Sequence, residues 1–107
     1  MIDKKIPNTV YDFKLADETT VKMTLRYYSL YLLKGKNKQA YEKYNKIMSK
    51  GPQEEIENVT VLYTAYLCAN LEHIEECMSE MEFLMNMPDN REYVNNILSS
   101  LIYPKKN

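Results

Sequence analysis

Residues 54–70, EEIENVTVLYTAYLCAN, contain a broad apolar stripe with the spacing of one helix face. Its members are Ile56, Val59, Leu62, Tyr63, Tyr66 and Leu67. The segment begins with several glutamates, which suit the positive end of a helix dipole. We therefore predict a helix over about residues 53–70.

The flanking sequence predicts four further helices. Their expected bounds are about 25–34, 37–49, 72–86 and 90–102. Gly35 is expected just past the first of them, where a left-handed backbone often ends a helix. Gly51-Pro52 separates the second helix from the third, and Asp89 with Glu92 has the spacing of a capping box. Short connections favour antiparallel neighbours, so the expected fold is all-α, a small bundle of about five helices.

Residues 10–24 allow two interpretations. Apolar and polar residues alternate on both sides of residues 16–19, which predicts a short N-terminal β-hairpin with its turn there. In the alternative, Asp17 caps a helix that begins directly after it. We expect residues 1–20 to be irregular or extended, residues 103–107 to be a frayed tail, and the 107-residue chain to form one helical domain.

The composition and charge distribution favour an interaction protein. The chain has 10 tyrosines and 7 methionines but no tryptophan. Tyrosine tolerates a wet interface and methionine adapts to varied partners, although an AT-rich genome would enrich both as well. Residues 1–50 carry a net charge of +6 and residues 51–107 carry −7. Opposite charges can steer head-to-tail self-association into a ring or spiral; the alternative is two solvated faces without a partner.

Patterns that indicate catalysis or metal binding are scarce. Two glycines cannot build a Gly-rich phosphate loop. His73 is the single histidine, and together with Cys77 it lacks the further ligands that zinc requires. The glutamates of residues 72–82 are expected on a solvated helix face instead of a dry cleft. We therefore expect no enzymatic activity, no metal and no other cofactor.

The cysteines and the hydropathy pattern indicate the cellular compartment in which the chain is expected. Cys68 and Cys77 are expected on helical sequence about 13 Å apart, too far for a disulfide, which indicates reduced thiols in a cytoplasm. No signal peptide is recognisable, and no stretch approaches the roughly 20 apolar residues of a membrane span, so no membrane association is expected.

Two groups of side chains are candidate partner-binding residues. Met78, Met81 and Met85 form a stripe with Ile74, and Met-lined grooves accept amphipathic helices of varied sequence. The alternative is that this stripe is the inward face of the bundle. The second group is Tyr27, Tyr28 and Tyr31. These three cannot all face inward on one helix, so at least one is expected to be exposed, with or without a role.

A DNA-binding function is a weaker hypothesis. Lysines are concentrated between residues 34 and 50, and lysine neutralises phosphates. Base recognition relies on other side chains, yet Arg26 and Arg91 are the only arginines, and the acidic second half would repel DNA. A small helix-turn-helix phage regulator is the form that this alternative takes. A third hypothesis is an adaptor that binds one folded partner.

Two segments resemble the opening of siphophage tail assembly chaperones. They are residues 21–26, VKMTLR, and residues 30–37, LYLLKGKN. In this family a short extended piece leads into a helix that ends near Gly-Lys. The size and composition of this chain are similar to those of the lactococcal tape measure protein chaperones. The resemblance implies a helical, non-enzymatic protein that oligomerises and coats the tape measure protein in the host cytoplasm. It also implies absence from the mature virion and provides no catalytic residues.

Overall fold

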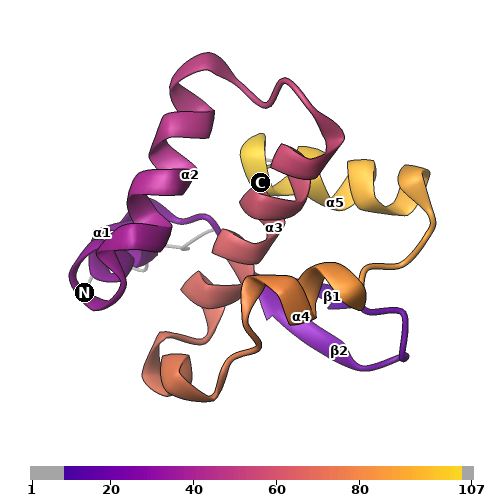
Figure 1. Cartoon of the computed structure of the whole chain (residues 1–107), viewed down its shortest axis with the longest axis horizontal. Helices are drawn as coiled ribbons and strands as arrows, with labels where there is room; N and C mark the ends of the chain where they lie inside the picture. The colour runs from indigo at the N-terminus through magenta and orange to yellow at the C-terminus, as the bar shows by residue number, and fades with distance from the viewer. Residues whose placement is uncertain (1–8, 105–107) are drawn as a thin grey trace, which may run out of the picture.

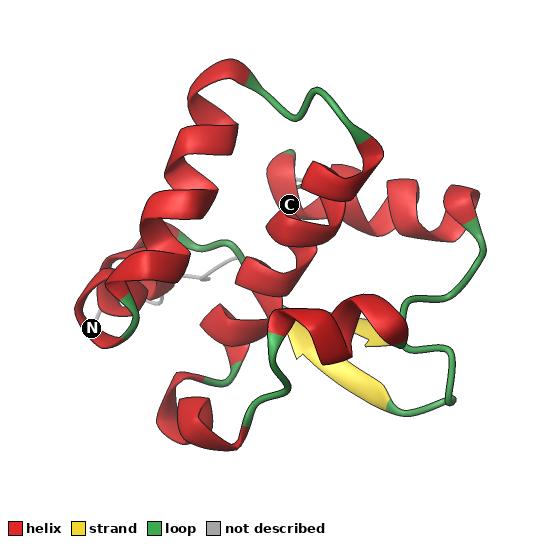
Figure 2. Cartoon of the chain, viewed as in Figure 1, coloured by secondary structure: helices red, strands yellow, loops and turns green. Residues whose placement is uncertain are grey.

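A computed structural model describes residues 9–104, which are mostly helical and include one antiparallel hairpin (Figures 1 and 2). The elements are β1 (Tyr11–Lys14), β2 (Thr20–Met23), α1 (Tyr27–Lys36), α2 (Lys38–Lys50), α3 (Glu55–Ala69), the 3₁₀ helix η1 (Leu71–Glu76), α4 (Glu80–Met85) and α5 (Arg91–Ile102). The helical fold class is thus confirmed, with the hairpin included. The parts of the expected N-terminal segment and tail at residues 1–8 and 105–107 lie outside the described residues.

The helix α3 forms the centre of the molecule, as Figure 1 shows. It packs against β2 and against each of the other described helices. Val61, Leu62 and Ala65 are fully buried, so more than one face of α3 is covered. The buried hydroxyl of Thr64 donates to the carbonyl oxygen of Thr60 at 2.9 Å, which satisfies its hydrogen-bonding need within the helix.

The N-terminal hairpin, one of the two interpretations of residues 10–24, is confirmed. Phe13 pairs with Val21 in the register of β1 and β2, and the pleat buries Phe13 and Met23 completely. The backbone N–H of Thr24 donates to the carbonyl oxygen of Ala65 at 3.0 Å. The hairpin is therefore fixed to α3, and the described part of the segment expected to be irregular or extended contains the extended strand β1.

The expected end of the first helix is wrong by two residues. Gly35 lies inside the last turn of α1, and the helix continues to Lys36. Asn37 ends it by donating its N–H to the carbonyl oxygen of Leu33 at 2.7 Å. The Asn37 side chain also accepts from the N–H of Ala40 at 3.0 Å, so one residue caps both α1 and α2. This double cap, and not the glycine, sets the boundary.

The single helix predicted over residues 72–86 is interrupted. Its first part is η1, and Cys77 has an extended backbone before α4 begins. Ser79 starts the new helix, because its Oγ accepts from the N–H of Glu82 at 3.2 Å while the Glu82 carboxylate accepts from the N–H of Ser79 at 2.9 Å. This reciprocal pair is a capping box, which competes with a continuous helix at this point.

Two tyrosines of α3 satisfy the backbone that the interruption exposes. The hydroxyl of Tyr66 accepts from the N–H of Met78 at 2.9 Å, and the hydroxyl of Tyr63 donates to the Met78 carbonyl oxygen at 2.8 Å. An unpaired, part-buried peptide group would cost free energy, so these bonds stabilise the break. They also fix the position of α4 relative to α3.

The capping box expected at Asp89 and Glu92 is also wrong. Asn90 caps α5 instead, accepting from the N–H of Tyr93 at 3.1 Å. Further along the first turn, the Tyr93 hydroxyl accepts from the backbone N–H of Lys14 at 2.8 Å, and its ring stacks on Phe13 at 5.2 Å between centroids. The start of α5 is thus positioned against the hairpin.

Candidate partner-binding site

The predicted methionine stripe is divided by the interruption before α4. Met78 lies in the break and is half-buried against the core, as is Ile74 in η1. Met81 and Met85, four residues apart on α4, are 62% and 79% exposed. The structure therefore places Met78 inward and the other two outward, so neither of the two sequence interpretations describes the whole stripe.

The helix α4 is anchored by its opposite side. Phe83 is completely buried, and its ring centroid lies 5.4 Å from that of Tyr66 and 5.5 Å from that of Tyr63. Aromatic contacts of this kind add to the stabilisation from burial. Because Phe83 and the capping box fix both the position and the start of the helix, Met81 and Met85 are held toward solvent.

A groove of about 490 Å³ lies among the beginning of α3, α4 and the beginning of α5. We call it the α4 groove. Its apolar lining consists of Ile56, Val59, Leu84, Met85, Met87 and Val94. Ile56 is 51% exposed, which is unusual for a large side chain on the most buried helix. The combination of a partly open apolar surface and flexible methionines suits an apolar anchor from another polypeptide.

Charged side chains also line the α4 groove. Arg91 Nε lies 2.6 Å from Glu55 Oε2, and this pair joins the first turns of α5 and α3. Both side chains are largely exposed, so the pair orients the surface more than it stabilises the fold. The sequence pattern places Ile56 on the apolar stripe of the helix predicted over residues 53–70, but it does not reveal that Ile56, Leu84 and Val94 meet at one open surface.

The tyrosine cluster lies elsewhere on the molecule. Tyr27, Tyr28 and Tyr31 are 91%, 65% and 72% exposed, while Leu30 and Leu33 bury the other side of α1. The helix α1 packs on α2, α3 and η1, and Figure 1 shows it apart from α4. The structure therefore shows two separate exposed apolar surfaces and does not bring the six predicted residues together in one site.

The division of charge along the sequence is partly cancelled within the fold. Lys43 Nζ lies 2.8 Å from Glu80 Oε1, and the other carboxylate oxygen of Glu80 accepts from the Thr60 hydroxyl at 2.7 Å. This network joins the basic helix α2 to α3 and to the acidic α4. Head-to-tail association by the two charged halves stays a prediction.

The lysines of α2 are exposed, but their context does not favour recognition of a DNA groove. A four-residue connection leads from α2 into α3, the position that a recognition helix would occupy in a helix-turn-helix. That helix is buried at the centre of the molecule, and its first turn contains Glu55 and Glu57. Phosphates would be repelled there.

Burial makes the thiols and several phenols less acidic. Desolvation raises the pKa of Cys68 to about 12 and also raises the pKa of Cys77, so both thiols are held in the weakly nucleophilic protonated form. Neither forms a disulfide: Cys68 lies in α3, and Cys77 lies in the extended segment between η1 and α4. Within residues 9–104, no three His, Cys, Asp or Glu side chains are grouped to hold a metal ion.

Between residues 9 and 104, every helix is too short or too polar to cross a membrane.

Comparisons with protein families, with characterised proteins and with solved structures found no match. The function is therefore inferred from the surfaces themselves.

Proposed function

We propose that this protein is a non-enzymatic chaperone that covers the apolar face of a helical partner protein through the α4 groove and through the exposed Met81, which lies one turn before the groove-lining Met85 on α4. The observation that carries this proposal is the outward position of Met81 and Met85 on a helix that is firmly anchored by Phe83. Met81 and Met85 are exposed because the packing of Phe83 turns their side of α4 toward solvent, and not because the helix is loosely packed. They offer a fixed apolar surface that an amphipathic helix can cover with its own stripe.

The expected affinity of one site is modest. Complete burial of a methionine or isoleucine side chain contributes about 1.5–3 kcal/mol. Ordering the partner and losing its translational freedom costs roughly 4–15 kcal/mol, so a few such contacts give only weak binding. Many copies on one long partner would make repeated weak contacts strong in total. This arrangement suits a protein that must later be displaced.

The resemblance to siphophage tail assembly chaperones specifies the partner in this proposal. The partner is the tape measure protein, a long helical rod whose apolar stripes contact water before the tail tube surrounds it. Exposed stripes of that kind favour aggregation. Copies of this chain would cover the rod in the host cytoplasm, oligomerise along it, and be absent from the finished virion.

Co-expression with an apolar siphophage tape measure fragment tests the proposal. The native chain is expected to raise the soluble fraction of the rod, and the double variant Met81→Ser/Met85→Ser is expected to lose this effect. Tyr103→Ser is the matched control, because Tyr103 is 76% exposed at the far end of α5 from the groove. A rod that stays equally insoluble with the native chain would contradict the chaperone function.

A triple variant of the tyrosine cluster, Tyr27→Ser/Tyr28→Ser/Tyr31→Ser, separates the two exposed apolar surfaces. If this variant loses the effect and the methionine variant retains it, the partner binds α1 and the assignment to the α4 groove is wrong. Because all five substituted side chains are more than half exposed, the variants are expected to fold.

A further inference from the structure

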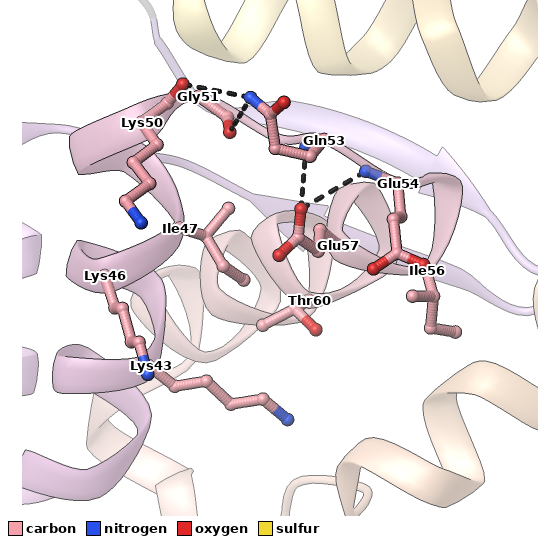
Figure 3. A pocket seen from close by; sticks show the side chains of 10 residues that line it. All are labelled: Lys43, Lys46, Ile47, Lys50, Gly51, Gln53, Glu54, Ile56, Glu57 and Thr60. Carbon is pink, nitrogen blue, oxygen red and sulfur yellow. Dashed lines mark hydrogen bonds between the residues drawn. The ribbon is translucent and has the colours of Figure 1, made fainter.

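A second cavity, of about 610 Å³, lies between the second half of α2 and the beginning of α3 (Figure 3). We call it the α2–α3 groove. The side formed by α2 contributes Lys43, Lys46 and Lys50. Lys43 is already paired with Glu80. Lys46 and Lys50 form no ion pair with any residue from 9 to 104, so they carry unneutralised positive charge at the cavity.

The opposite side of the α2–α3 groove is acidic. Glu54 and Glu57 line it from the start of α3, and the Glu57 carboxylate accepts from the N–H groups of Gln53 and Glu54 at 2.6 and 3.2 Å (Figure 3). Neither glutamate forms an ion pair with a residue in the described range. The basic and acidic sides therefore face a common cavity without joining across it.

Apolar side chains occupy the space between the two charged sides. Ile47 lines the cavity from α2, and the 51% exposed Ile56 lines it from α3. A small apolar centre with charged groups around it is the usual composition of a protein interface. The cavity thus has the chemistry of a contact surface and is larger than the α4 groove.

A surface with one basic and one acidic side is complementary to itself. A two-fold rotation places the basic side of one copy against the acidic side of the other, and does so twice. Two-fold dimers are the commonest oligomers, and they use the same surface patch on both subunits. We propose that the α2–α3 groove is the contact between two copies of this chain, with Lys46 and Lys50 of each copy facing Glu54 of the other.

This contact deepens the proposed function by specifying how copies meet, but it requires no helical partner. Exposed ion pairs contribute little individually and are screened by salt. The dimer is therefore expected at low ionic strength and is expected to dissociate as salt is added. An assay on the purified chain alone leaves the α4 groove proposal untouched whatever its outcome.

Sedimentation of the full chain at about 0.02 M and about 0.5 M salt is the first test, since the range of exposed charges shortens severalfold between them. We expect a dimer at low salt and a monomer at high salt. The variant Lys46→Glu/Lys50→Glu, with two acidic sides, is expected to be monomeric in both. Lys34→Glu/Lys38→Glu is the matched control, because it changes the net charge equally on exposed residues outside the cavity.

A charge exchange gives the sharper test. Glu54→Lys alone is expected to weaken the dimer, because it places a lysine opposite Lys46 and Lys50 of the other copy. In an equal mixture with Lys46→Glu/Lys50→Glu, each of the two contacts again joins opposite charges, so a heterodimer is expected at low salt. Its recovery would also show that both variants fold.

Three results would overturn the two-fold contact. One is a native chain that is monomeric at low salt, and another is a mixture that stays monomeric. The third is growth of the native chain into assemblies larger than a dimer, which would indicate the head-to-tail contact instead.

Discussion

The helices α3 and α4 contain apolar side chains in similar proportion, but those of α3 point mainly into the core, whereas two of those in α4 point toward solvent. In α3, Val61 and Leu62 are fully buried. In α4, only Phe83 is buried, while Met81 and Met85 on the other side are mostly exposed. The longer helix is covered by all the other described helices, whereas α4 packs chiefly on α3. Apolar content alone therefore does not show which side chains form the core. The contacts that anchor each helix determine that.

Truncating the anchor of α4 is expected to have the largest effect. Phe83→Ala removes a fully buried ring and its contacts with Tyr63 and Tyr66, which is expected to cost about 3–5 kcal/mol of unfolding free energy. Met85→Ala, on the same helix, is expected to change it by less than about 0.5 kcal/mol. Equilibrium unfolding in urea measures both. Similar losses for the two variants would show that Met85 is packed inside.

The pH dependence of stability is expected to separate the two helices, with the larger effect in alkali. Burial raises the pKa of Tyr63 in α3 from 10.0 to about 12. Because the folded phenol holds its proton more tightly, its contribution is complete below the unfolded pKa and is lost as the pH rises from 10 to about 12. Deprotonation also removes the hydroxyl donor to the Met78 carbonyl oxygen. Equilibrium unfolding of Tyr63→Phe should therefore show a smaller loss of stability over this alkaline range.

The loss of stability at low pH depends on α4 and is expected to be the smallest of these effects. Hydrogen bonds from the backbone and side chain of Ser79 lower the pKa of Glu82. The folded carboxyl therefore releases its proton more readily than the unfolded one, so its contribution is present above the unfolded pKa and is lost as the pH falls through the folded pKa. Melting temperatures of Glu82→Gln and the native chain should converge in acid. An unchanged difference at every pH would contradict this role of Glu82.

The sequence was sufficient for elements with long periodic patterns. The helix predicted over 53–70 is observed at Glu55–Ala69, and the last helix is observed within a residue of its predicted start. Apolar periodicity predicts such helices because burial of one face stabilises them. The hairpin was only one of two alternatives, because the decisive bond from Thr24 to Ala65 joins residues distant in sequence.

The interruption before α4 had a local signal that the methionine stripe obscured. Ser79 and Glu82 have the same three-residue spacing that suggested a capping box at Asp89, yet the apolar pattern continues through Met78 and favours one helix. The outward position of Met85 could not be predicted from this pattern. It depends on which side of α4 contacts Tyr63 and Tyr66, and that is set by tertiary packing.

We propose the exposed methionines of α4 as the surface that binds a helical partner. Methionine methyl resonances, followed by NMR during titration with an amphipathic helical peptide from a siphophage tape measure protein, test it directly. The resonances of Met81 and Met85 are expected to shift in proportion to binding, while that of the completely buried Met23 stays in place. Binding of the peptide without a shift at Met81 and Met85, or no binding by the native chain, would contradict the claim.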